Sequence, residues 1–260
     1  GYLDISGILT AGEAGAEVDI DASGQFWTNG YADSDELDVD VDGGRFANDG
    51  ALTGTVDMTV TDGQALLATQ GGTFDLSAES RLLIDGAEGR VGFDGTGDQT
   101  ATLRLEEGST LGFATKDGAL GSIEEFRSGF YGDAPTEVQS GVNLGQATLH
   151  LDLKGLEQAS LTHTLVDVDE IVGSLKDIQV AGLADDQGAH IVVDYDNDMI
   201  TLELLGGNAG QVSYESIGDM NDAQEAAALW EALTDGQPTL SETPPTTEVT
   251  DEDPFLEDAA

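Results

Sequence analysis

The 260-residue sequence contains no cysteine, only five prolines and only eight basic residues. The lack of cysteine excludes disulfides, zinc–thiolate sites and thiol catalysis, and it fits a secreted bacterial protein. No run of about 18 apolar residues occurs, so the sequence predicts no transmembrane helix. Few prolines beside 35 glycines indicate tight turns, and a hydrophobic content of 39% predicts that most of the chain folds.

The scarcity of basic residues has its own consequences. Against 52 acidic residues it leaves a formal net charge of −44. Nucleic acids and anionic membrane surfaces are therefore poor partners, because both are bound through Lys and Arg. Cations, basic partners or a salty medium are the natural counterparts of such a surface. The alternative is that the charge serves solubility alone.

The stretch ELDVDVDGG, residues 36–44, alternates apolar and acidic residues before two glycines. This is the period of a β-strand with one buried and one exposed face. Leu37, Val39 and Val41 would face a core. The exposed face would hold only carboxylates, from Glu36, Asp38, Asp40 and Asp42.

Similar stretches, EVDIDASGQF from Glu17 and TVDMTVTDGQALL from Thr55, recur at a spacing near 20 residues. This spacing predicts a β-solenoid whose coils are about 20 residues long and stack as parallel strands about 4.8 Å apart. Glycines would turn the corners. An antiparallel sandwich is the structural alternative. The inward ladders expected of the solenoid are Val18–Leu37–Val56 and Phe26–Phe46–Leu66.

Four segments are expected along the chain. Residues 1–145 would form the solenoid coils, and 146–206 a β cap that includes a hairpin from Val192 to Leu205. Residues 207–236 would form a linker and a short helix, which begins with the capping pair Asp222 and Glu225 and ends at Gly236. Residues 237–260 form an acidic Pro/Thr tail. The apolar face of the helix would hold Ala226, Leu229, Trp230 and Leu233.

The coil segments GGRFANDGALTG (43–54), GGTFDLSAESRLLIDG (71–86) and ATLRLEEGSTLGF (101–113) resemble the passenger domains of bacterial autotransporters and related pectin-lyase-like surface proteins. Residues 160–183 and 190–204 resemble the β cap of these proteins. The resemblance implies a right-handed parallel β-helix, secreted or at the cell surface. It also implies a mostly adhesive or structural role, with some enzymes in the family.

Catalytic motifs are lacking. The three histidines, His150, His163 and His190, have no nucleophile motif beside them and are expected to be satisfied surface or edge residues. With 52 acidic residues, carboxylate pairs carry no information about glycosidase chemistry. Arg45 and Arg90 are expected to form ion pairs with acidic residues. We therefore expect no enzyme activity and no required cofactor.

Two groups of acidic residues are candidate metal ligands, with Ca²⁺ as the candidate ion. At a 19-residue spacing Asp19, Asp38 and Asp57 would form one outward ladder, with Asp21 and Asp40 in a second ladder beside it. Cations between the rungs would relieve the repulsion, as would screening by salt without a bound ion. Asp194, Asp196 and Asp198 match the first three positions of an EF-hand loop. That loop lacks its glycine and its final glutamate, so a polar hairpin turn is the alternative.

The sequence thus favours a non-enzymatic extracellular solenoid that forms an adhesive surface, a matrix or filaments. Its partners would be copies of itself, a host or cell-surface molecule, or a glycan. The alternative is a carbohydrate-active β-helix, either a polysaccharide lyase or a glycan binder similar to a tail-spike. Nucleic-acid binding and membrane insertion are not expected.

Overall fold

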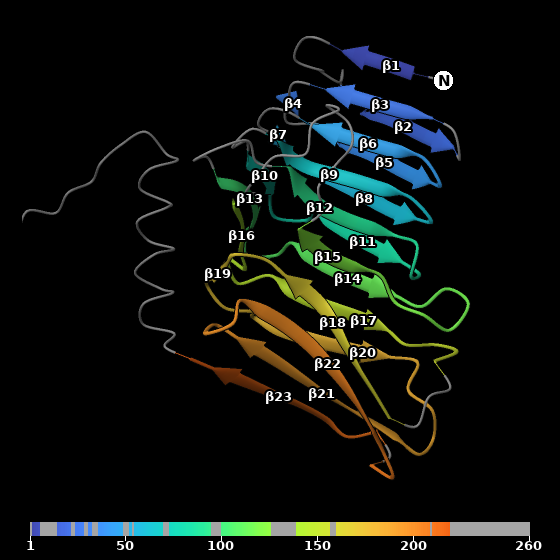
Figure 1. Ribbon diagram of the computed structural model, residues 1–260, viewed down its shortest axis with the longest axis vertical. Helices are drawn as coiled ribbons and strands as arrows, with labels where there is room; N and C mark the ends of the chain where they lie inside the picture. The colour runs from blue at the N-terminus through green and yellow to red at the C-terminus, as the bar shows by residue number, and fades with distance from the viewer. Residues whose placement is uncertain are drawn as a thin grey trace, which may run out of the picture.

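The structure is a computed structural model, and it describes residues 2–5, 15–21, 24–28, 31–32, 36–48, 52–53, 55–69, 73–94, 100–125, 139–156, 160–208 and 210–218. Every regular element in these ranges is a β-strand, and none of them contains a helix (Figure 1). The helix expected from Asp222 and the tail from Gln237 lie outside the described residues. The strands form three sheets.

The seven-stranded sheet is parallel throughout and carries the alternating stretch that opens the repeat. In spatial order its strands are β2 (Ala16–Asp21), β5 (Leu37–Asp42), β8 (Val56–Thr61), β11 (Arg81–Asp85), β14 (Thr110–Ala114), β17 (Thr148–Asp152) and β20 (Asp177–Ala181).

The six-stranded sheet is also parallel. Its order is β19 (Glu170–Val172), β16 (Gln139–Asn143), β13 (Thr100–Leu105), β10 (Thr73–Leu76), β7 (Leu52–Thr53) and β4 (Tyr31–Ala32).

The ten-stranded sheet is parallel through its first seven strands and mixed at its end. Its order is β1 (Tyr2–Ile5), β3 (Gln25–Thr28), β6 (Arg45–Asn48), β9 (Gln64–Thr69), β12 (Arg90–Asp94), β15 (Ser122–Glu125), β18 (Ser160–Asp167), β22 (Met199–Gly206), β21 (Gln187–Asp194) and β23 (Val212–Ile217).

Successive strands visit the seven-stranded, ten-stranded and six-stranded sheets in turn, from β2, β3 and β4 through β17, β18 and β19. Equivalent strands of successive turns lie side by side down the long axis (Figure 1). This all-β, parallel arrangement is compatible with the expected solenoid, and the parallel pairing excludes an antiparallel sandwich. The coils are not uniformly about 20 residues long, because the register advances 21 residues from Ala16 to Leu37 but 38 from Leu111 to Leu149.

The expected core ladders are correct in part. Leu37 lies beside Val56, and Phe26 lies beside Phe46 with ring centroids 5.7 Å apart and planes 8° from parallel. Val18, however, lies beside Val39, so the predicted Val18–Leu37 neighbours are wrong by two residues. The prediction for Leu66 is also wrong, by one residue, because Leu66 lies beside Ala47.

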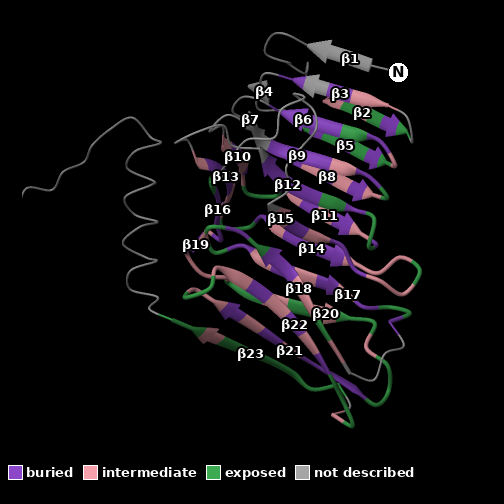
Figure 2. Ribbon diagram, in the orientation of Figure 1, coloured by how far each residue is buried: buried purple, intermediate pink, exposed green. Residues whose placement is uncertain are grey.

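Alternation along each strand builds the core. In β5 and β8 the inward residues, from Leu37 and Val39 to Met58 and Val60, are at most 1% exposed, while their neighbours face outward (Figure 2). Burying one such side chain is worth roughly 1.5–3 kcal/mol. The core is aliphatic, with stacked rings only at Phe26 and Phe46 among the described residues.

Glycine makes the corner between the seven-stranded and ten-stranded sheets. A Cβ on Gly44 would lie 2.7 Å from the Asp21 carbonyl oxygen and against the Ile20 side chain. On Gly63 it would lie 2.8 Å from Val41 Cγ1. The corner of one coil therefore rests directly on the coil before it, and the expectation that glycines turn the corners is confirmed there.

The end of the molecule combines parallel and antiparallel pairing. β18 pairs with β15 in parallel and with β22 antiparallel, and β21 with β22 forms the expected hairpin. The boundary predicted between residues 145 and 146 separates β16 from β17, although both strands belong to parallel sheets. Residues 212–217, predicted as part of a linker, form β23.

Candidate functional site: an acidic sheet face

The outward side of β2, β5 and β8 forms a regular array of side chains. Neighbouring strands of a parallel sheet place residues in register about 4.8 Å apart. Seven of the nine outward positions are carboxylates, which we term the acidic face, and the other two are Thr59 and Thr61. The acidic face comprises Glu17, Asp19, Asp21, Asp38, Asp40, Asp42 and Asp57.

The rungs of this array differ from the prediction at β2 alone. Asp38 lies beside Asp57, as expected. Asp19 lies beside Asp40 rather than Asp38, and Asp21 beside Asp42. The three ladders are therefore Glu17–Asp38–Asp57, Asp19–Asp40–Thr59 and Asp21–Asp42–Thr61. The five predicted residues do share one face, together with Glu17 and Asp42, which were not included among the candidate ligands.

Asp40 lies at the centre of the acidic face. Partial burial raises the pKa of the Asp40 carboxyl group, and the carboxylates of Asp19, Asp42, Asp38 and Asp21 raise it further. Two unit charges about 5 Å apart repel by roughly 0.8 kcal/mol in water and about 3 kcal/mol at an effective dielectric constant of 20. Mutual repulsion on this face therefore opposes folding.

The charge changes beyond β8. In the outward ladder that contains Asp38 and Asp57, the next positions are Arg81 and Thr110. At the adjacent turn, Lys116 Nζ donates a hydrogen bond of 2.6 Å to Asp62 Oδ2. This bond, with attraction to Asp62, Asp42 and Asp85, raises the pKa of Lys116. The acidic array is thus confined to one end of the sheet.

The described residues contain no cluster of three or more His, Cys, Asp or Glu side chains arranged to hold one metal ion. On the acidic face the carboxylates project in parallel from a flat sheet rather than converging on one point. Such an array suits cations held between neighbouring pairs, or a diffuse layer of counter-ions, rather than a closed coordination shell.

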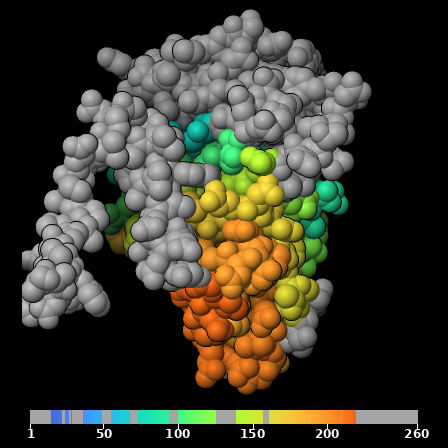
Figure 3. Space-filling model, turned by 60° about the vertical axis from the view of Figure 1, so that its left-hand side comes forward, coloured from blue at the N-terminus to red at the C-terminus, as the bar shows by residue number. Residues whose placement is uncertain are grey.

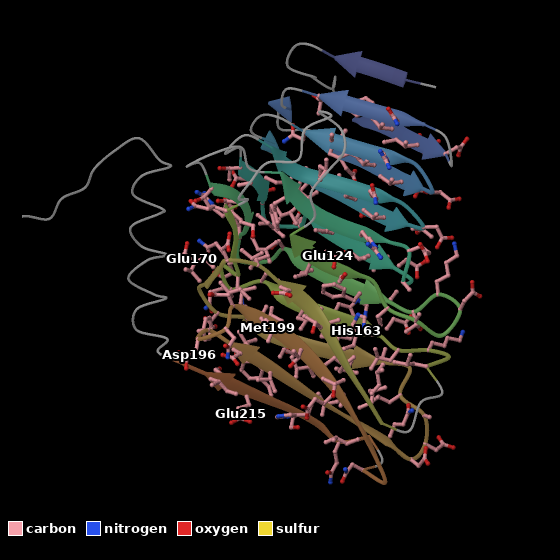
Figure 4. All side chains as sticks on the ribbon, in the orientation of Figure 1. Glu124, His163, Glu170, Asp196, Met199 and Glu215 are labelled. Carbon is pink, nitrogen blue, oxygen red and sulfur yellow. The ribbon has the colours of Figure 1, made fainter. Side chains whose placement is uncertain are left out.

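The second candidate group forms a turn. Asp194 Oδ1 accepts hydrogen bonds of 3.1 Å from the backbone N–H groups of Asp196 and Asn197. Asp198 Oδ1 instead accepts one of 2.8 Å from the Ile171 N–H. Burial is the main cause that raises the pKa of Asp198, and it also raises that of nearby Glu170 (Figure 4). Asp194 and Asp198 thus serve the hairpin turn and its contact with β19.

The three histidines lie apart. His150 stands on β17 beside Gly112 and Gln179, and His163 Nε2 lies 3.1 Å from the Gly121 carbonyl oxygen (Figure 4). His190 Nδ1 is 2.9 Å from Ser213 Oγ, and its Nε2 is 3.5 Å from Glu215 Oε2. This last set joins a hydroxyl, an imidazole and a carboxylate across β21 and β23. Its members stand along a sheet face, and Ser213 and Glu215 are exposed.

A shallow groove of about 250 Å³ runs along the glycine corner. It is lined by Gly43, Gly44, Arg45, Asp62, Gly63, Gln64, Glu88 and Arg90. Arg45, Gln64 and Arg90 occupy one register ladder on β6, β9 and β12. The expected ion pairing is found for Arg90, whose Nη1 lies 3.4 Å from Glu124 Oε1.

Neither the groove nor the His190 set was predicted from the sequence, since both depend on contacts across strands. The GGR and DGQ turns at residues 43–45 and 62–64 are the signal that could have pointed to the groove.

Comparisons with protein-family models, curated proteins and solved structures gave no match. Within the described part of the chain, no helix has the length and hydropathy needed to span a membrane.

Proposed function

We propose that the protein is a non-enzymatic, extracellular β-solenoid of the adhesive or structural kind, secreted or held at a cell surface. Its coils would have the right-handed parallel β-helix form of autotransporter passengers. The acidic face is its working surface, and cations, Ca²⁺ in particular, bridge it to a second copy or to an acidic surface molecule. The observation that carries the proposal is the set of seven carboxylates on three adjacent strands.

The sign of the charge determines the mode of association. A protein of net charge −44 repels its own copies, and two acidic faces repel most strongly at contact. Divalent cations with oxygen ligands remove this barrier, and Ca²⁺ accepts flexible carboxylate geometry at about 2.3–2.6 Å. A flat array without a basic side chain at its nine positions favours this exchange over recognition of an anion.

The groove supports a second candidate function, binding or cleavage of a polysaccharide. Arg45 and Arg90 lie there with Asp62, Glu88 and Gln64, a set that can hydrogen-bond a sugar and neutralise a sugar carboxylate. This candidate predicts that Arg90→Gln abolishes binding or cleavage of a uronic-acid oligosaccharide while far-UV circular dichroism stays unchanged. Absence of binding and cleavage by the wild-type protein would reject it.

Sedimentation velocity tests the main proposal. At constant ionic strength, millimolar Ca²⁺ should shift the protein from monomer to larger species, and EDTA should reverse the shift. The triple variant Asp38→Asn, Asp40→Asn, Asp57→Asn should remain monomeric. The matched control is Asp85→Asn, Asp152→Asn, Asp177→Asn. It changes the charge equally on later strands of the same sheet and should associate as the wild type does.

Loss of association in both triple variants would assign the effect to net charge and contradict a role for this face. Monomer at every Ca²⁺ concentration would contradict the assembly proposal.

A further inference from the structure

The described residues expose four large apolar side chains, and all four lie on β22 and β23. Leu205 is 38% exposed, Val212 46%, Tyr214 43% and Ile217 40%. β23 is the last strand in the order of the ten-stranded sheet, at the lower end of the molecule (Figures 1 and 3). In a chain of net charge −44, this concentration of apolar side chains marks a docking surface.

Val212 and Tyr214 lie on the core side of the sheet. They stand in register with Ala189 and Ile191 of β21, which are at most 1% exposed. Side chains in register on neighbouring strands point to the same face. The layer that covers β21 therefore ends before β23, and the core side of this strand is left open.

The open side carries no charge of its own. Glu215, the acidic residue of β23, points to the opposite face, where it contacts His190. Tyr214 lies near Tyr195, whose pKa is raised to about 12 by burial and by the neighbouring Tyr214 hydroxyl. The occupant of this surface should therefore be apolar and of strand length, about 20 Å for six residues.

We propose that residues 222–235 of the same chain dock on the open side of β23 as an amphipathic helix. The residues Ala226, Leu229, Trp230 and Leu233 recur at the i, i+3, i+4, i+7 spacing of one helix face. Asp222 and Glu225 provide a capping pair at its start. A helix of 14 residues is about 21 Å long, which matches the strand.

The connection between the two elements favours this occupant. Only residues 219–221 separate Gly218, where the described chain ends, from Asp222. Three residues span at most about 10 Å, so the helix must begin near Ile217 and can run back along β23. At about 1.5 Å per helical residue and 3.3 Å per strand residue, Leu229 then lies opposite Tyr214, and Leu233 lies opposite Val212.

A second copy could also cover β23, but it would have to overcome the repulsion between two chains of −44. A segment tethered by three residues acts at an effective concentration in the millimolar range. The two unpartnered apolar faces, one on each side of a short linker, therefore satisfy each other within one molecule.

Disulfide trapping tests this proposal directly, because the chain has no cysteine of its own. Two cysteines can be bridged when their Cα atoms lie within about 7 Å. In dilute protein with EDTA, Val212→Cys with Leu233→Cys should oxidise to a bond within one chain. Ser213→Cys with Leu233→Cys places the first thiol on the opposite face, and Val212→Cys with Ala226→Cys pairs the wrong ends. Both controls should oxidise at least tenfold more slowly.

Equal rates in the three pairs would contradict docking, and so would a predominantly interchain product, which would assign the surface to a second copy. EDTA keeps this result independent of cation-dependent assembly through the acidic face.

Quenching by acrylamide gives a second measurement. In a Trp27→Phe variant, Trp230 is the sole tryptophan. It should be shielded, and Tyr214→Ser with Val212→Ser should raise its quenching constant several-fold. Quenching of Trp230 as strong as that of a free indole before these changes would contradict the proposal.

Discussion

Asp40 stands directly beside Asp19 on β2 and beside Thr59 on β8, with Asp38 and Asp42 flanking it on its own strand. Burial and the surrounding carboxylates raise its pKa above the ordinary value of 3.8. The folded protein thus binds this proton more tightly than the unfolded chain does. Stability contributed by Asp40 is therefore lost as the pH rises from about 3.8 through the raised pKa.

Asp40→Asn should raise the free energy of unfolding by about 0.5–1 kcal/mol at pH 7, low salt and EDTA, since like charges in register destabilise a sheet by this order. The gain should vanish below pH 3.8, where Asp40 is protonated in both states, and shrink in 1 M NaCl. Urea unfolding at several pH values measures it. Asp85→Asn is the control, because Asp85 lies between Thr61 and Ala114 and attracts Lys116. A gain of equal size in both variants would contradict the local origin.

Leu37 ties two coils together, because it packs between Ala16 and Val56 and is 1% exposed. Leu37→Ala should lower the free energy of unfolding by about 2–5 kcal/mol through loss of burial and formation of a cavity. Thr59→Ala, an outward position on the next strand, should change it by less than about 0.5 kcal/mol. Equal effects in chemical denaturation would mean that the inward and outward assignments are wrong.

The glycine corner offers a test of coil stacking. Gly44→Ala should lower the free energy of unfolding by more than about 2 kcal/mol, because the new methyl group would meet the Asp21 carbonyl oxygen and the Ile20 side chain. Gly112→Ala is the control, since its nearest neighbour, 3.0 Å away, is the end of the flexible Leu83 side chain. Thermal unfolding that leaves Gly44→Ala as stable as Gly112→Ala would contradict the close contact between coils.

The alternating stretch at residues 36–44 predicted a strand, its buried side and its neighbours correctly, because alternation fixes which face is buried. It could not fix the register with β2. A shift of two residues keeps every apolar side chain inward, so Val18 and Ala16 were equally acceptable partners for Leu37. The Asp19 and Asp21 rungs inherited the same error.

Leu66 was misplaced for a different reason. The register with β12 pairs Gly92 with Leu66 but Phe93 with Ala68, so β9 carries an irregularity that passes over Leu67. A constant repeat length cannot anticipate such an extra residue. The groove and the cap edge depend on contacts across strands, and these also lie beyond a repeat pattern. The residue types of the acidic face, in contrast, were evident from the sequence.

The most direct test of the central claim, that the acidic face binds cations, is the melting temperature in millimolar Ca²⁺ at constant ionic strength. An ion at about 100 times its dissociation constant stabilises the folded state by about 2.7 kcal/mol, or roughly 5–10 °C for a domain of this size. We predict an increase of this order, which Asp38→Asn abolishes and Asp85→Asn preserves. Equal stabilisation by NaCl of the same ionic strength would contradict a bound ion and leave a surface screened by salt alone.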